Sequence, residues 1–253
     1  MSFAKRASQK ARGQAPPRAL AGGGPGRYFA PMRPLPSRAV VLSTLLGTLL
    51  GALGAGACRT KDPSITEPFV DAFDRAELGP AWNTTGADYR ITDGKLTIAR
   101  GYNHPAWLRR KLPADVVIEV DAMSKSPAGD LKMELYGDGE SFDTDKGSYV
   151  SSGYVMILGG WNNSLSVICR NNEHDEGRKT ERRDFRVEPG RSYHWTITRR
   201  GGQLDWKIDG RPFLAWSDPT PLSGPGHEYL AVNNWESDVT FDNLAVTPLR
   251  AGP

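Results

Sequence analysis

The stretch YHWTITRRGGQLDWKIDG, residues 193–210, decides the fold. Apolar residues occupy every second position on both sides of its Gly-Gly pair: Tyr193, Trp195, Ile197, Leu204, Trp206 and Ile208. A period of two is that of a β-strand with one buried face. Gly201-Gly202 supplies the positive φ that a tight hairpin turn requires. The stretch therefore predicts a hairpin whose six apolar side chains belong to the core.

The rest of the chain continues this pattern. YRITDGKLTIAR (89–100) predicts a second hairpin on Asp93-Gly94. Further strand-like runs separated by turn residues are VVIEVDAMS (116–124), DLKMELYG (130–137), GYVMILGG (153–160), SLSVICR (164–170), PFLAWS (212–217), EYLAVNNW (228–235) and VTFDNLAV (239–246). So many strands, without a sustained helical period or a fixed repeat, predict two packed sheets in one all-β domain over residues 69–249.

Several of these segments resemble the concanavalin A-like lectin/glucanase superfamily. They are VDAFDRA (70–76), DGKLTI (93–98), VVIEVDA (116–122), residues 193–210 and VTFDNLAV (239–246). The resemblance implies a jelly-roll sandwich of two antiparallel sheets, one convex and one concave, with sugar on the concave face and its rim loops. The motifs are structural, so they imply the fold more directly than an activity.

The N-terminal part resembles a bacterial lipoprotein signal. An uncharged run from Ala39 to Ala57 follows Arg33 and Arg38 and ends before Cys58. We expect residues 1–31 to be a non-native or disordered extension, 32–57 a signal peptide and 58–68 a flexible tether. Residues 250–253 would form a short C-terminal tail. Cleavage would leave Cys58 as a lipidated N-terminus and place the protein in the cell envelope, with the outer membrane as the expected site.

Two other interpretations of this leader stay open. Ala55 departs from the lipoprotein pattern, which usually has Leu at that position, and Ala55-Gly56-Ala57 fits the A-x-A rule of ordinary signal peptidase. That cut would release a soluble periplasmic or secreted protein. An uncleaved membrane anchor is the third interpretation, although the glycines in the run make it a weak spanning helix.

The charge of the chain argues against nucleic acid as a partner. Eight of the 32 Lys and Arg residues precede Cys58, which leaves 24 basic against 29 acidic residues, a balance of −5. Such a body has no basic footprint for nucleic acid. The sequence has no phosphate-binding glycine loop, so no nucleotide is expected, and membrane contact is expected only through a lipid on Cys58. Cys169 is predicted to be a small buried hydrophobic residue, and the sequence does not require a disulfide between Cys169 and Cys58.

Two segments combine tryptophan with amides at a strand end. Trp161, Asn162 and Asn163 form one, and Asn233, Asn234, Trp235 and Glu236 form the other. An aromatic face packs against the C–H side of a sugar ring, and amides bond its hydroxyl groups. We therefore predict that these residues bind carbohydrate, although turn-capping amides and core tryptophans would explain them equally well.

A charged segment, RNNEHDE (170–176), directly follows one predicted strand. Arg170 would lie at the edge of the sugar site and clamp a carboxylate or sulfate. Glu173 and His174, together with Glu236, are the candidates for acid/base catalysis. The alternative is a solvated loop without chemistry.

The best-known hydrolase pattern of the superfamily is incomplete in this chain. It has E-x-D-x-E on one strand, whereas Glu119-Val120-Asp121 is followed by Ala122 and Met123. The sequence therefore leaves enzymatic activity undecided and favours a protein without it. No cofactor is expected apart from a weak possibility of calcium, whose oxygen ligands would be Asp138, Glu140, Asp143 and Asp145.

These observations predict a cell-envelope lipoprotein whose jelly-roll domain binds a carbohydrate or polysaccharide. A hydrolase or lyase of the same fold, using Glu173, His174 or Glu236, is the first alternative. A non-catalytic structural or protein-binding module is the second, favoured if both tryptophans are buried between the sheets.

Overall fold

The hairpin around Gly201-Gly202 forms as predicted. In the computed structural model, which describes residues 62–142 and 151–250, β11 (Ser192–Arg200) pairs antiparallel with β12 (Gln203–Ile208). Gly201 has φ 54°, in the left-handed region that a tight turn needs. All six predicted core side chains of the hairpin are at most 5 % exposed.

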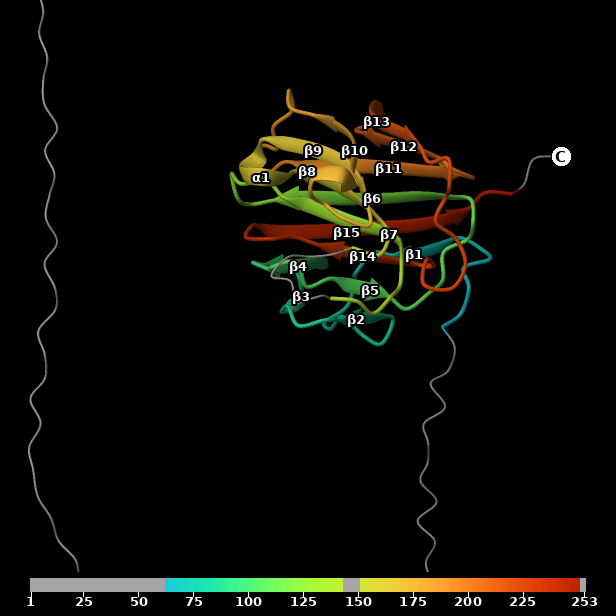
Figure 1. The fold of residues 1–253 in the computed structure, drawn as a ribbon. Coiled ribbons are helices and arrows are strands. Elements are labelled where there is room, and N and C mark those ends of the chain that lie inside the picture. Colours follow the sequence, from blue (N-terminus) through green and yellow to red (C-terminus); the bar gives the residue numbers. More distant parts are fainter. Residues whose placement is uncertain (1–61, 143–150, 251–253) are drawn as a thin grey trace, which may run out of the picture. The chain divides into compact units, whose positions relative to one another are not determined.

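The larger sheet has the order β13-β12-β11-β6-β15-β4-β3, and β1 also pairs with β15 (Figure 1). Its other strands are β1 (Phe69–Asp71), β3 (Tyr89–Thr92), β4 (Lys95–Ala99), β6 (Val116–Ser124), β13 (Arg211–Ser217) and β15 (Asp238–Pro248). Strands β3 and β4 form the hairpin predicted on Asp93-Gly94.

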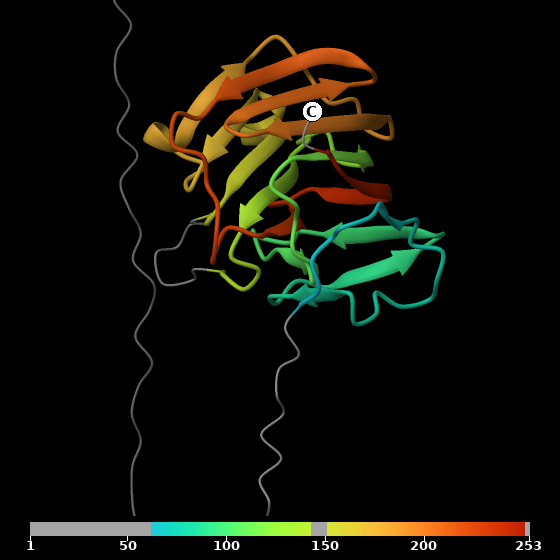
Figure 2. The same ribbon diagram turned by 90° about the vertical axis from the view of Figure 1, so that its right-hand side faces the viewer.

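The second sheet has seven strands in the order β10-β9-β8-β7-β14-β5-β2. They are β2 (Trp82–Thr84), β5 (Ala106–Leu108), β7 (Leu131–Gly137), β8 (Tyr154–Gly159), β9 (Leu165–Arg170), β10 (Arg178–Arg182) and β14 (Tyr229–Asn233). The described strands pair antiparallel throughout, and the two sheets pack face to face (Figure 2). The predicted jelly-roll sandwich is confirmed. Two short helical turns, α1 (Gly160–Asn163) and η1 (Asp175–Gly177), flank β9.

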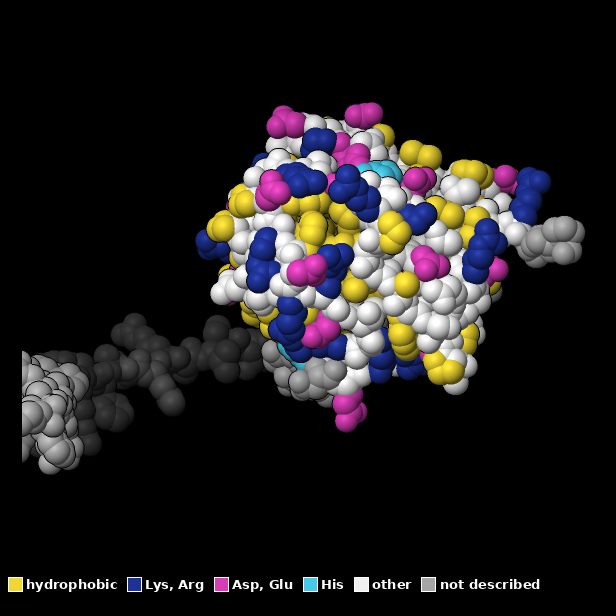
Figure 3. Space-filling view, turned by 90° about the horizontal axis from the view of Figure 1, so that it is seen from above, with side chains coloured by type: hydrophobic (Ala, Val, Ile, Leu, Met, Phe, Trp, Pro, Cys, Tyr) yellow, Lys and Arg dark blue, Asp and Glu magenta, His cyan; other side chains and the backbone are white. Residues whose placement is uncertain are grey.

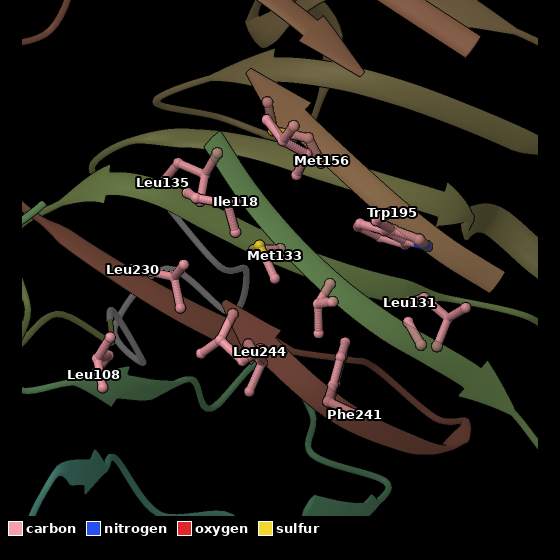
Figure 4. Packing of buried hydrophobic residues seen from close by; sticks show 14 of the residues in the cluster. Leu108, Ile118, Leu131, Met133, Leu135, Met156, Trp195, Leu230, Phe241 and Leu244 are labelled. Carbon is pink, nitrogen blue, oxygen red and sulfur yellow. The ribbon is translucent and has the colours of Figure 1, made fainter. Parts of the chain in front are cut away.

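The core lies between the sheets and follows from the alternation of the strands. In β6, Ile118, Val120 and Ala122 are buried while Glu119 and Asp121 between them are partly exposed. Figure 4 shows Ile118 of β6 with Met133 of β7 and Leu244 of β15 in one layer of side chains. In β7, Leu131, Met133 and Leu135 all join this core, so Lys132 and Glu134 point to the outer face of the seven-stranded sheet.

Some predicted features fall at or beyond the edge of the described residues. The predicted leader, with Cys58, lies outside them, as do Asp143 and Asp145. Ile65 is buried in the core and donates its backbone N–H to the Lys111 carbonyl, so packing begins before Phe69. Within residues 62–142 and 151–250, no helix has the length and apolar character needed to cross a membrane.

Candidate functional site

A pocket of about 580 Å³ opens on the outer face of the seven-stranded sheet. Its walls come from loops that follow β8, β9 and β14 and precede β5 and β7. The lining residues are Asn103, Ala128, Asp130, Lys132, Trp161, Asn162, Glu173, His174, Trp235, Glu236 and Ser237. Six of the predicted site residues are thus brought together: Trp161, Asn162, Glu173, His174, Trp235 and Glu236.

The floor of the pocket is a buried network centred on Lys132. Its ammonium donates to Asn103 Oδ1 at 2.8 Å and to Glu173 Oε2 at 2.9 Å, and lies 3.6 Å from Asp130 Oδ1. Asn103 Nδ2 in turn donates to Glu173 Oε1 at 3.2 Å. A charge can be buried when it is paired and hydrogen-bonded in this way. The network fixes two carboxylates and one amide beneath the pocket.

The charges of the floor depend on one another. Burial lowers the pKa of Lys132, but the negative charges of Asp130 and Glu173 outweigh this and raise it above its ordinary value. Burial raises the pKa of Asp130, and the ammonium of Lys132 offsets this in part. Lys132 therefore stays cationic across the physiological pH range and holds both acidic side chains in place.

One wall is a left-handed turn that carries Trp161. Trp161, Asn162 and Asn163 have φ values of 49°, 58° and 58°, so α1 is not a right-handed helix at these residues. Non-glycine residues in this region cost about 1 kcal/mol each, although asparagine tolerates it best. Such conformations persist where the surroundings impose them, and they concentrate at binding sites. Here the turn directs Trp161 into the pocket.

Asn163 holds this turn in place. Its side-chain amide donates to the carbonyls of Pro127 at 3.1 Å and Val187 at 2.8 Å, and its Oδ1 accepts the Val187 N–H at 2.8 Å. Asn163 is buried and does not line the pocket. The structure therefore places it behind Trp161, where it fixes the turn rather than facing a ligand.

Trp161 is supported from several sides. It packs on an apolar cluster of β8 and β9 that includes Ile157, Val167 and Cys169. The Arg178 guanidinium lies 4.3 Å from the centre of its ring, and the His174 ring meets it edge-on at 5.8 Å. Cys169 is fully buried, and burial raises the pKa of its thiol to about 12, as expected of an inert hydrophobe.

Trp235 forms the other aromatic part of the pocket and is 42 % exposed. Its backbone N–H donates to the Asp130 carboxylate, and Tyr102 packs edge-on against its ring with centroids 5.2 Å apart. Asn233 and Asn234 are buried and support this loop. Asn233 Oδ1 accepts the Asn234 N–H at 2.8 Å, and Asn234 Oδ1 accepts the Gly101 N–H at 2.9 Å. Both amides lie behind Trp235 and outside the pocket lining.

Three further polar residues belong to the lining: His174, Glu236 and Ser237. His174 is partly exposed, and its Nε2 lies 3.6 Å from Glu173 Oε1. Glu236 is exposed next to Trp235. The Ser237 hydroxyl is fully buried and has no hydrogen-bond partner among the described residues. A buried hydroxyl without a partner is costly, so Ser237 holds an unused hydrogen-bonding group at the pocket.

Arg170 lies away from the pocket lining. Its Nε donates to Asp218 Oδ2 at 2.9 Å, and its Nη2 donates to the Thr220 carbonyl at 3.2 Å. The guanidinium is therefore engaged in an internal ion pair. The structure gives it no position from which to clamp an acidic sugar in this pocket.

The remaining predicted acidic groups also lie elsewhere. Glu119 and Asp121 are on the outer face of the eight-stranded sheet, where Asp121 Oδ1 bonds His194 Nδ1 at 2.8 Å. Asp138 Oδ1 accepts the backbone N–H groups of Glu140 and Ser141 at 2.9 and 2.7 Å, which is a turn-capping role. Within the described residues, no group of three or more His, Cys, Asp and Glu is arranged to hold a metal ion.

A second groove, of about 530 Å³, lies along β12 and β13 at the end of the eight-stranded sheet. Trp206, Phe213 and Leu214 contribute much of its lining, next to an irregularity in the pairing after Trp206. Figure 3 looks down on the upper strands of Figure 1, where hydrophobic side chains gather in a hollow with lysine and arginine around it. This groove lacks the buried polar floor of the first pocket, so we place the functional site at the Lys132 network.

Comparison with solved structures supports the fold. The carbohydrate-binding module CBM66 of Bacillus subtilis superposes with a TM-score of 0.52 at 14 % identity, over 66 % of this chain and 96 % of that one. The exoplasmic/lumenal domain of VIP36 gives 0.55 at 9 % identity, over 74 % and 93 %. A structure from work on endo-acting O-glycanases of the human gut microbiota gives 0.50 at 13 % identity, over 72 % and 99 %. At these identities the likeness establishes the galectin-like, concanavalin A-like sandwich.

Comparison of the sequence adds one partial match. Residues 141–245, less than half of the chain, match the model of a family described as farnesoic acid O-methyl transferase. This segment runs from before β8 into β15, so it belongs to the same sandwich as the pocket. No curated protein matches the chain.

Proposed function

We propose that the sandwich domain binds carbohydrate in the pocket between Trp161 and Trp235. One observation carries the proposal: two tryptophans line one cavity whose floor is a buried network of charged and amide groups. An exposed indole such as that of Trp235 can pack against the C–H surface of a sugar ring, and convergent carboxylate, amide and hydroxyl groups can bond the ring hydroxyls. The fold likeness to carbohydrate-binding modules supports the proposal by analogy.

The polar floor suits hydroxyl recognition because its groups are already oriented. Lys132 and Asn103 hold both oxygens of Glu173, and the backbone N–H of Trp235 holds Asp130. Each carboxylate oxygen can accept a further hydrogen bond, which a sugar hydroxyl group can donate. Side chains fixed before binding lose little conformational entropy on binding, which favours affinity.

The proposal extends to the location of the protein. A lipid on Cys58 would tether the domain to a membrane of the cell envelope, with the pocket free to meet polysaccharide outside the cytoplasm. Mass spectrometry of the mature N-terminus tests this. A diacylglyceryl modification on Cys58 that disappears in C58S supports it, and an unmodified N-terminus supports simple export instead.

A polysaccharide hydrolase or lyase remains the second candidate because Glu173, His174 and Glu236 all reach the same pocket. A pair of carboxylates flanking a bound sugar is the usual requirement for glycoside cleavage. Release of reducing ends or of unsaturated products from a bound polysaccharide, lost in E236Q, would establish it. A purely structural module is disfavoured, because Trp235 is 42 % exposed rather than packed between the sheets.

A glycan array followed by calorimetry tests the binding proposal. The wild type is compared with W161A and W235A, and with W216A as a matched control whose indole lies on β13 and outside the pocket lining. We expect each pocket variant to lose about tenfold or more in affinity, or about 1.4 kcal/mol, while W216A binds as wild type. Equal affinity in all four proteins would remove the pocket from the site.

A further inference from the structure

The side chains that line the pocket carry an excess of negative charge. Asp130, Glu173 and Glu236 contribute three carboxylates, and Lys132 contributes one ammonium. These four side chains together carry a formal charge of −2. Arg178 is not among the lining residues; its guanidinium lies 4.3 Å from the centre of the Trp161 ring, and its Nε donates to the Glu173 carbonyl at 3.3 Å. Among the Asp, Glu, Lys and Arg side chains that line the ligand space, the acidic ones therefore predominate.

Glu236 is the least constrained of these acids. Its side chain is exposed, and among the described residues it takes part in no hydrogen bond or ion pair, whereas Asp130 and Glu173 share the Lys132 ammonium. It lies in sequence directly between the exposed indole of Trp235 and the buried, unpartnered hydroxyl of Ser237. A carboxylate and an exposed indole that line the same pocket can together attract a cationic group, by charge and by cation–π interaction.

The pocket offers an anionic ligand no counterpart. The lining contains no arginine, and its single ammonium, on Lys132, is already bonded to Asn103 and Glu173. Arg170, which would have served an acidic sugar, is paired with Asp218. A uronate or a sulfated sugar would bring a like charge to within a few ångströms of two or three carboxylates, which is unfavourable.

From these observations we infer that the saccharide bound here carries a free, positively charged amino group, as a glucosamine unit does. The amine would pair with Glu236 beside Trp235, and the Ser237 hydroxyl would bond a neighbouring ring substituent. The inference rests on the proposed carbohydrate site and specifies the class of sugar that it selects.

Isothermal titration calorimetry at pH 6 tests this with three probes: a β-1,4-linked glucosamine hexamer, the N-acetylglucosamine hexamer and an oligogalacturonate. We expect the glucosamine hexamer to bind about tenfold tighter than its acetylated form, and the oligogalacturonate to bind more weakly than either. The preference should shrink to about threefold or less when the salt concentration is raised tenfold, because screening weakens charge pairing. E236Q should abolish the preference, and E77Q, which alters an exposed carboxylate outside the pocket lining, should keep it.

The outcomes separate the inference from the proposed function. Equal binding of the two hexamers by the wild type, with both lost in W235A, overturns the amine preference and leaves the carbohydrate site intact. Tighter binding of the oligogalacturonate overturns the preference in the same way. Absence of binding to these probes and to a full glycan array overturns both.

Discussion

Replacing Lys132 by methionine would leave two buried carboxylates without the ammonium that now lies between them. The ammonium is 2.9 Å from Glu173 and 3.6 Å from Asp130, and all three side chains are at most 10 % exposed. Removal of one partner from a buried ion pair typically costs about 3–5 kcal/mol, because the remaining charge is neither solvated nor paired. Methionine has a similar length, so loss of packing contributes little. We expect K132M to lower the free energy of unfolding by about that amount at pH 7.5.

The loss should depend on pH with a defined sign. In K132M the two carboxyl groups would have folded-state pKa values above their unfolded ones, so the folded state binds more protons as the pH falls. Urea unfolding followed by tryptophan fluorescence should therefore show a smaller loss at pH 5 than at pH 7.5. The triple variant D130N/K132M/E173Q, which removes all three charges, should be more stable than K132M at pH 7.5. A loss below about 1 kcal/mol that is the same at both pH values would refute this account of the network.

Three further predictions concern stability and the shape of the site. Burial raises the pKa of Glu134 from 4.5 to about 8. The contribution of this carboxyl group to the free energy of unfolding is therefore largest at low pH, and it falls by up to about 1.4 kcal/mol per pH unit between pH 4.5 and pH 8. E134Q should flatten the pH dependence of urea unfolding over that range, and an unchanged slope would contradict the raised pKa. N163A removes three hydrogen bonds that hold the Trp161 turn, so it should lower the free energy of unfolding by about 1–3 kcal/mol and also weaken glycan binding. A loss of stability with wild-type glycan affinity would show that the turn keeps its shape without these hydrogen bonds. Hydrogen bonding to Asp121 raises the pKa of His194, so the pair stabilises the fold below pH 6.5 and this stabilisation is lost as the pH rises through the folded-state pKa of His194. Because the pair is partly exposed, H194A should lower the free energy of unfolding by less than about 1 kcal/mol at pH 5.5 and by nothing measurable at pH 9. A larger loss at pH 9 than at pH 5.5 would contradict the raised pKa.

The fold could be predicted because local signals and global architecture agree. The period of two in residues 193–210 and the turn residues Gly201 and Gly202 specify a hairpin whose buried face is the same in sequence and structure. The same holds for β6, where Ile118, Val120 and Ala122 point inward and the acids between them outward. In such strands the core face is determined by the side chains alone.

The pocket could be predicted only in part. Trp161 and Trp235 were recognisable because each follows a strand and lies among amides, and both line the pocket. The neighbouring amides have different roles: Asn162 lines the pocket, whereas Asn163 makes hydrogen bonds to backbone groups and lies outside the lining. Which way an amide points depends on backbone conformation, and a left-handed turn at three non-glycine residues leaves little signal in the sequence.

The polar floor could not be predicted from local pattern. In DLKMELYG, Lys132 lies between Leu131 and Met133, so the alternation predicts that it faces solvent on a strand with one buried face. It is buried because Asn103 and Glu173, 29 and 41 residues away in sequence, fold over it. Ser237 gave no signal for the same reason, since its position depends on the loop after β14. Arg170 looked available because its partner Asp218 lies 48 residues further along the chain.

The central claim is that a carbohydrate occupies the pocket between Trp161 and Trp235, and indole N–H resonances test it most directly. The chain has seven tryptophans, and Trp107, Trp195 and Trp206 are at most 1 % exposed. In a ¹⁵N–¹H correlation spectrum titrated with the tightest-binding glycan, the resonances of Trp161 and Trp235 should shift together with one dissociation constant, while those of the three buried indoles stay in place. Saturable binding that leaves both pocket indoles unshifted would contradict the account.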